Sequence, residues 1–315
     1  MTSLVIDHRN VSLDYEQDCV LVRQEGVRPR SIPIVRLQRI QCMHNTVVST
    51  RLLGQCQARG VDFIVINSRF SQHCFAVYAQ HIEQCQRRIN QYRLASDPVL
   101  ALPLSRRLVV NKLARSRHAL EARTESDARD SALSAFEEAG QRARNVLDPD
   151  ILRGIEGAAQ RALFEYWRTE LPGKLGFRQR LRRPSPDPVN ALLSLSFTLI
   201  YHEAIRQCYR HGLDPWLGFY HLPSPGRRSL ACDLVEPLRP LIEAWVVDGF
   251  CRGEFDLRQF SLRDGQCTLG KAGRAHFYEA WQSKLGFWSK RLGHYATILA
   301  RHLKVAIAVN ESPVE

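Results

Sequence analysis

The sequence predicts an α+β protein: a small N-terminal domain resembling a β-sandwich, residues 1–80, followed by a larger all-α-helical domain, residues 81–315. Two observations lead to this prediction. Apolar residues follow the short spacing of strands up to about residue 80 and the 3.6-residue period of helices beyond it. The length of 315 residues favours two domains, because domains typically hold roughly 100–200 residues. With 44% hydrophobic and 24% charged residues, the chain is globular rather than disordered.

The N-terminal domain is expected to contain five short strands and one helix. Runs rich in Val, Ile and Leu alternate with turn residues such as Asp18, Gly26 and Gly60. These runs place strands at 3–8, 11–15, 19–24, 30–35 and 61–67, and a helix at 47–59. We expect two packed sheets, and an edge strand of such a domain is a natural surface for dimerisation.

The second domain is expected to be built from seven helices, at 81–94, 105–123, 127–146, 149–171, 188–211, 233–249 and 274–309. Asp148 and Asp187 each precede a proline, which suits an N-cap followed by proline at the first helical position. Residues 96–103 and 177–188 are predicted as loops. A break of the last helix near Gly286 or Gly293 is left open.

The charge of the chain favours an anionic partner. The formal net charge is +12, and 38 of the 44 basic residues are arginines, whose planar guanidinium groups match phosphate oxygens. A GC-rich genome can explain the excess of arginine over lysine, but it does not explain the net charge. Residues 1–85 contribute only +2, so +10 belongs to the remainder. Nucleic acid is therefore the expected partner, bound mainly by the second domain.

Other classes are disfavoured by what the sequence lacks. The longest mostly apolar stretch, 191–201, is about half the length that a bilayer requires, so no membrane span is expected. The N-terminus has neither the basic region nor the long apolar core of a signal peptide. We therefore expect a cytoplasmic protein, with its nine cysteines reduced. None of the cysteines form a CxxC pair, so a zinc site is not expected.

Three segments carry side chains suited to catalysis. In the first, Glu156 borders an apolar helical stripe and is flanked by Gly154 and Gly157, which suggests close approach of a bulky group to the backbone. The second contains a single histidine, His221, in a loop after a long helix. Taken alone, each segment is better explained structurally, as a surface glutamate beside packing glycines and as a structural histidine.

The third segment places Asp233 and Glu236 three residues apart, on one side of a helix. Pro237 is tolerated if that helix begins near Asp233. Asp233 as N-cap with Glu236 as its capping-box partner is the structural alternative, and it stays open beside a catalytic role.

The combination of these segments suggests a metal site. Two carboxylates and an imidazole suit Mg²⁺ or Mn²⁺, and the imidazole tilts the choice slightly towards Mn²⁺. Such an ion can activate a phosphodiester and an attacking hydroxyl. Nearby basic residues are candidates for holding a DNA backbone without reading its sequence, with solvated loop charges as the alternative: Arg182, Arg183, Arg227, Arg228 and Arg239.

Several sequence motifs follow one another in the second domain. The segment RPSPDPVNALLS at 183–194 closely resembles a segment of the CRISPR adaptation integrase family, the "Cas-one" proteins. The motifs GLDP at 212–215, GFYH at 218–221 and SLACDLVEPLRP at 229–240 continue the pattern in the same order. GIEG at 154–157 is similar to the family's glutamate motif. The resemblance spans about residues 149–242; the N-terminal domain matches in layout and size only.

The resemblance implies a metal-dependent DNA integrase in which Glu156, His221 and Glu236 hold Mg²⁺ or Mn²⁺. Many members carry aspartate where Glu236 stands, and Asp233 matches a further acidic position whose role is less defined. Family members form dimers partly through contacts between their β domains. These dimers bind a small companion subunit. The 3′-hydroxyl of a captured foreign DNA fragment attacks the boundary of a CRISPR repeat, without a nucleotide cofactor.

Two alternatives remain at this stage. The same three ligands could serve a metal-dependent nuclease that uses water to cleave branched or single-stranded DNA. A non-catalytic DNA-binding scaffold, in which the acids are helix caps and His221 is structural, is the alternative outside enzymes. It predicts salt-dependent DNA binding that is indifferent to EDTA.

Overall fold

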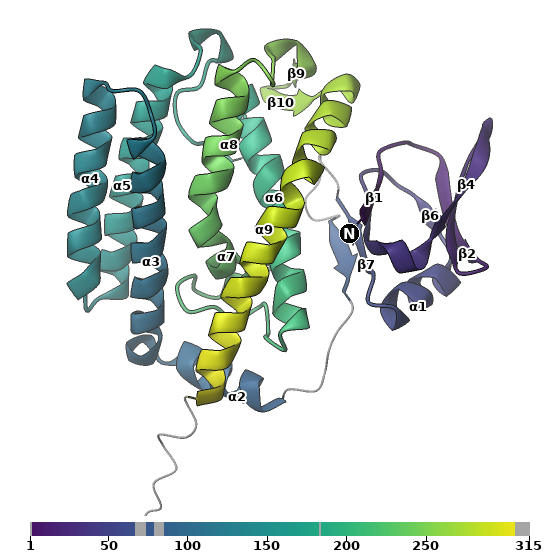
Figure 1. Ribbon diagram of the computed structural model, residues 1–315, viewed down its shortest axis with the longest axis horizontal. Coiled ribbons are helices and arrows are strands. Elements are labelled where there is room, and N and C mark those ends of the chain that lie inside the picture. The colour runs from purple at the N-terminus through teal and green to yellow at the C-terminus, as the bar shows by residue number, and fades with distance from the viewer. Residues whose placement is uncertain (1, 67–73, 79–84, 183, 306–315) are drawn as a thin grey trace, which may run out of the picture. The chain divides into compact units, whose positions relative to one another are not determined.

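The computed structural model describes residues 2–66, 74–78, 85–182 and 184–305 (Figure 1). The chain divides into two compact units. The first holds Met1–Cys85 with Tyr209–Leu213, and the second holds Gln86–Cys208 with Asp214–Glu315. Strands dominate the first unit and helices the second, so the predicted α+β fold class is confirmed. The predicted limit between residues 80 and 81 falls outside the described residues.

The first unit contains two four-stranded sheets. One has the order β1-β5-β7-β8, in which β1, β5 and β7 are parallel and β8 is antiparallel to β7. The other has the order β4-β3-β2-β6, with antiparallel β2, β3 and β4, and with β6 parallel to β2. The bounds are β1 Thr2–Ile6, β2 Val11–Glu16, β3 Cys19–Gln24, β4 Val27–Pro33, β5 Leu37–Cys42, β6 Val47–Val48, β7 Asp62–Val65 and β8 Phe75–Val77.

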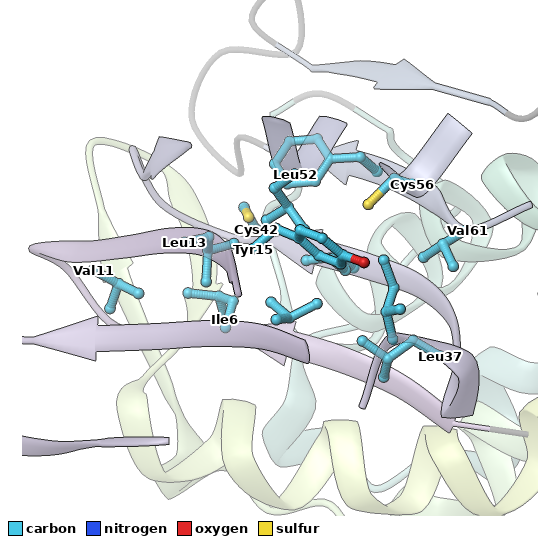
Figure 2. Close-up of a cluster of buried hydrophobic side chains, with 13 residues drawn as sticks. Ile6, Val11, Leu13, Tyr15, Leu37, Cys42, Leu52, Cys56 and Val61 are labelled. Atoms are coloured by element: carbon cyan, nitrogen blue, oxygen red, sulfur yellow. The ribbon is translucent and has the colours of Figure 1, made fainter. Parts of the chain in front are cut away.

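Both sheets contribute to one apolar core (Figure 2). Leu13 from β2 and Ile40 from β5 are almost fully buried in it, together with Leu52 and Cys56 from helix α1 (Thr50–Ala58). The alternating burial along β2 reflects the two-residue period of its sequence.

The sequence prediction missed β5, β6 and β8, and it began the helix too early. Val47–Val48 extends the second sheet instead, and α1 starts after Ser49, whose hydroxyl accepts a hydrogen bond from the backbone N–H of Leu52. An N-cap serine satisfies an amide that no intrahelical carbonyl can reach, and this fixes the start of the helix. The predicted strand 61–67 is shorter, Asp62–Val65, and residue 67 is outside the described residues.

The second unit is mostly helical. In Figure 1, α3, α4 and α5 lie side by side, and their mutual contacts support this arrangement. The helices are α2 Cys85–Ser96, α3 Pro98–Glu121, α4 Asp127–Asn145, α5 Pro149–Glu170, α6 Pro188–Arg210, α7 Ser229–Val235, α8 Arg239–Cys251 and α9 Lys271–Val305. Asp148 caps α5 as predicted, accepting from the N–H groups of Asp150 and Ile151. None of the described helices is long and apolar enough to cross a membrane.

The structure corrects three local predictions. Residues 96–103 are not a loop, because Asp97 caps α3 and Pro98 occupies its first turn. Helix α9 runs unbroken past Gly286 and Gly293. The second unit is also not purely helical: a hairpin of β9 (Phe260–Arg263) and β10 (Gln266–Leu269) lies between α8 and α9 in the chain.

The helix predicted at 233–249 is in fact two helices joined by a 3₁₀ turn. Helix α7 begins at Ser229, so Asp233 lies inside it and is not its N-cap. The 3₁₀ turn Glu236–Leu238 follows, and α8 restarts at Arg239. Pro237 has no N–H to donate to an α-helical carbonyl, so the turn between the two helices accommodates it.

Candidate active site

A cavity of about 410 Å³ in the second unit brings three of the four predicted catalytic residues together, without Asp233. Glu156 on α5, His221 in the loop before α7 and Glu236 on the 3₁₀ turn all line it. The cationic residues of its lining outnumber the two glutamates: Lys112, Arg153, Arg161, Arg180, Arg182, Arg227 and Arg239. The cavity therefore combines a small acidic centre with a strongly positive wall.

Glu156 reaches the cavity from the border of the buried face of α5. Leu152, Ile155 and Ala159 on that face are almost fully buried, which fixes the rotation of the helix. The expected close approach at the flanking glycines is not observed among the described residues. A Cβ at Gly154 would meet nothing within 4 Å, and one at Gly157 would meet only Arg161 Nη1, at 4.0 Å.

Asp233 holds the loop that carries His221. Its Oδ2 accepts from the backbone N–H groups of Phe219 and Tyr220, at 2.6 and 3.0 Å, and its Oδ1 accepts from that of His221, at 3.0 Å. The Asp233 side chain is only 3% exposed. The capping-box interpretation is therefore wrong: Asp233 caps three amides of a distant loop rather than the start of its own helix.

Gly218 allows that loop to pass close to α7. A Cβ there would lie 2.6 Å from Asp233 Oδ2 and 2.8 Å from the backbone carbon of Ser229. Because the second contact is with backbone, a larger residue would force the loop away. Position 218 of the GFYH motif therefore requires glycine for a steric reason that the sequence did not reveal.

Asp233 also orients the His221 ring, whose Nδ1 lies 2.7 Å from Asp233 Oδ1. A carboxylate accepts hydrogen bonds, so this contact places a proton on Nδ1, and in the neutral imidazole the lone pair is then on Nε2. Nε2 lies 3.7 Å from Glu236 Oε1. This is the carboxylate–histidine arrangement that supports metal-bound histidines in many proteins.

Lys112, on α3, bridges the two glutamates. Its Nζ donates to Glu156 Oε1 and lies 2.6 Å from Glu236 Oε2. Burial disfavours the ammonium, but Glu236 and Glu156 together outweigh it and raise the pKa of Lys112. For Glu236, burial opposes the charge while Lys112, Arg239 and His221 favour it, and the result is a lowered pKa. Both partners are therefore charged near neutral pH.

The donors at this centre fit a divalent cation. Among the described residues, no three His, Cys, Asp or Glu side chains already form a group that could hold a metal ion. However, the Lys112 ammonium shows that Glu156 and Glu236 converge on a single cation. Each carboxylate keeps a second oxygen, and the one on Glu236 faces His221 Nε2. Two carboxylates and an imidazole are ligands that suit Mn²⁺ and Mg²⁺.

The predicted DNA-binding arginines occupy different environments. Arg182 and Arg227 line the cavity, whereas Arg228 lies over the ring of Trp216, 4.7 Å from its centroid. The Arg239 side chain is only 15% exposed and pairs with Glu236 and Glu243, so it belongs to the acidic centre. Arg183 lies outside the described residues.

Further residues that were not predicted from the sequence line the cavity, among them Arg180, Tyr220 and Lys112. Burial, with Arg239 and Arg182 nearby, lowers the pKa of Arg180 to about 10. Tyr220 places its hydroxyl 3.4 Å from Glu156 Oε2. A signal for Lys112 was present, because residue 112 falls on the apolar face of its helix, beside Val109.

Comparisons with known proteins agree with this fold and identify the family. The family described as CRISPR associated protein Cas1 matches residues 4–283. A relative from Thermodesulfovibrio yellowstonii, described as CRISPR-associated endonuclease Cas1 1, is 30% identical over 312 residues, which cover 94% of this chain and 96% of that protein.

Two solved structures share the fold. A casposase bound to integration product has a TM-score of 0.83 at 16% identity, over 96% of this chain and 90% of that one. A chain of a Cas6-RT-Cas1–Cas2 complex has a TM-score of 0.83 at 19% identity, over 96% of this chain and 35% of that one. Since the family match spans most of the sequence, this chain belongs to the CRISPR-associated Cas1 family.

Proposed function

We propose that this protein is a metal-dependent DNA integrase of CRISPR adaptation. It joins the 3′-hydroxyl ends of foreign DNA fragments to the boundary of a CRISPR repeat. The convergence of Glu156, Glu236 and the Nε2 face of His221 at one cavity with a positive wall carries this proposal. A helix-cap role does not account for this arrangement, because Asp233 accepts from three amides of the loop while Glu156 and Glu236 share the Lys112 ammonium.

Glu156, Glu236 and His221 would hold Mg²⁺ or Mn²⁺ through carboxylate oxygens and Nε2. The ion supplies charge stabilisation for the phosphoryl group and lowers the pKa of an attacking hydroxyl. Asp233 keeps the imidazole in the tautomer that leaves Nε2 unprotonated. In the reaction, the attacking 3′-oxygen loses its proton and bonds to phosphorus, while the P–O3′ bond of the target strand breaks and that oxygen gains a proton.

The positive wall suits the DNA backbone. Arg153 and Arg161 line the cavity from α5, the helix that carries Glu156, and Arg182 and Arg227 line it from loops. A guanidinium group can bind two oxygens of one phosphate at once, but such contacts do not depend on the base sequence. Choice of the repeat then depends on DNA shape or on partner proteins. We further propose that the protein forms a homodimer partly through its β domain and binds a small companion subunit. The Cas6-RT-Cas1–Cas2 complex named above, with its Cas2 component, supports the companion.

A strand-transfer assay tests the proposal. A short duplex with free 3′-hydroxyl ends is incubated with a supercoiled plasmid containing a CRISPR repeat, with Mn²⁺, Mg²⁺ or EDTA, with and without the companion subunit. We expect joining that needs the metal and is abolished by Glu156→Gln. The matched control is Glu165→Gln on the same helix, whose side chain is 66% exposed, and it should join DNA like the wild type.

Two other outcomes would replace the proposal. Metal-dependent cleavage without joining, even with the companion present, would indicate a nuclease that uses water as its nucleophile. Salt-sensitive DNA binding without chemistry, unaffected by EDTA or by Glu156→Gln, would indicate a scaffold.

A further inference from the structure

Lys112 is the buried exception among the lysines of this chain. The chain has six lysines, and the other five are all exposed. The Lys112 side chain is 4% exposed and contacts both Glu156 and Glu236, which are 17% and 5% exposed. A chain that uses arginine for 38 of its 44 basic residues thus places a lysine at its acidic centre. An ammonium is a compact point charge, closer in size and charge density to a metal ion than a planar guanidinium is.

The ammonium and a divalent cation have reason to exclude one another. Both are attracted by the same pair of carboxylates, and Nζ already takes one oxygen of each. A metal held by the remaining oxygens would lie within a few ångströms of Nζ, where like charges repel strongly because burial lowers the effective dielectric constant. Arg239, 3.5 Å from Glu236 Oε1, adds a second positive charge to the same carboxylate. A metal ion therefore requires Lys112 to move.

The cavity adjoins the Lys112 side chain. Because Lys112 lines it, a rotation of the flexible stem would carry Nζ towards the space that a DNA phosphate would fill. A phosphate there offers the displaced ammonium a new anionic partner. DNA binding and metal binding would then support each other, because each supplies the charge that the other requires.

We propose that Lys112 is an internal stand-in cation that competes with the divalent metal for Glu156 and Glu236, and that DNA relieves this competition by accepting the displaced ammonium. The inference rests on the proposed metal site. It predicts weak metal binding by the free protein and tighter binding in the presence of DNA. A purely structural lysine, which merely holds the two carboxylates in place, predicts the opposite effect of its removal.

Isothermal titration with Mn²⁺ separates the two roles. Lys112→Met keeps an unbranched side chain only one atom shorter and removes the charge, and we expect it to bind Mn²⁺ at least tenfold more tightly than the wild type. Glu156→Gln should bind more weakly than either, and Lys284→Met, which removes an exposed lysine, should match the wild type. Equal or weaker binding by Lys112→Met, with Glu156→Gln still weakened, would overturn the role of Lys112 and leave the metal site standing. Unaltered Mn²⁺ binding by Glu156→Gln would overturn both.

A measurement on the wild type avoids any dependence on the folding of Lys112→Met. With lysine labelled by ¹⁵N, the five exposed ammonium groups exchange rapidly with water, and Lys112 should give the one protected ammonium resonance. We expect Mg²⁺ to shift or remove this resonance, and a short DNA duplex to lower the Mg²⁺ concentration needed by about tenfold. Mg²⁺ binding that depends on Glu156 but leaves the resonance unmoved would refute the competition.

Discussion

Replacing Asp233 with asparagine should loosen the histidine loop by a predictable amount. The two carboxylate oxygens serve four donors: Oδ2 accepts from Phe219 and Tyr220, and Oδ1 accepts from the N–H and the Nδ1–H of His221. Asparagine offers one oxygen, and its amide nitrogen is itself a donor. Two backbone N–H groups lose their acceptor if the amide nitrogen replaces Oδ2, and at least one does if it replaces Oδ1, where the imidazole can change tautomer and accept through Nδ1.

The expected cost follows from this count. A buried donor left without an acceptor costs about 1–3 kcal/mol, and the lower half of that range applies because part of the loop contacts solvent. Asp233→Asn should therefore lower the free energy of unfolding by about 1–4 kcal/mol. At roughly 3 °C per kcal/mol for a unit of this size, the Tm falls by roughly 3–12 °C. Metal affinity should also fall, by about 10–100-fold, because His221 loses the carboxylate that orients it.

Urea denaturation followed by circular dichroism, together with Mn²⁺ titration, measures both effects. Asp130→Asn is the matched control, because the Asp130 side chain is 60% exposed and pairs only with its neighbour Arg129 in the described part of the chain. That substitution should change the free energy of unfolding by less than about 0.5 kcal/mol. If Asp233→Asn were as stable as this control, the loop would not depend on Asp233 and the reasoning would be wrong.

Two further predictions concern the same region. Gly218→Ala should lower both stability and Mn²⁺ affinity, because its Cβ would collide with Asp233 and with the backbone of Ser229. Gly54→Ala is the control, because Gly54 lies within helix α1 and a Cβ there meets nothing within 4 Å. Thermal unfolding should show that this control is more stable than the wild type by about 0.5–1 kcal/mol. Arg161→Gln should reduce the slope of log K for duplex DNA against log salt by about 0.9, the share of one phosphate contact. Arg228→Gln should leave that slope unchanged, because Arg228 lies over Trp216. An unchanged slope in Arg161→Gln would show that this part of the cavity wall does not contact the DNA backbone.

The periodicity of apolar residues predicted the fold class and most helices, and it failed where polar residues are buried. Strand β5 was missed because Arg39 and Gln41 interrupt its apolar run, yet both are only 2% exposed. A central parallel strand is normally apolar on both faces, so buried polar residues hide it from the sequence. The start of α3 was missed for a different reason. Pro98 and Pro103 suggested a loop, but the first proline is tolerated in the first turn, and the helix accommodates the second.

The candidate site was likewise only partly predictable from the sequence. Residue chemistry made Glu156, His221, Asp233 and Glu236 candidates, and the family resemblance then selected Glu156, His221 and Glu236, which the structure brings to one cavity. The role of Asp233 could not be read from spacing, since a capping box and a loop anchor place the same residue types three positions apart. Only the tertiary fold shows that the amides next to Asp233 belong to residues 219–221.

The charges at the centre explain why metal and DNA should depend on each other. Lys112 and Arg239 already balance Glu156 and Glu236 in the protein alone, so a divalent cation adds two charges that nothing in this set compensates. A backbone phosphate brings negative charge to a wall that is otherwise positive. When metal and DNA are both present, the metal ion, Lys112 and Arg239 each have an anionic partner, in a site that is largely shielded from water. An integrase built in this way would hold its metal weakly until a DNA end arrives, and that would restrict phosphodiester chemistry to the complex that contains both DNA and metal.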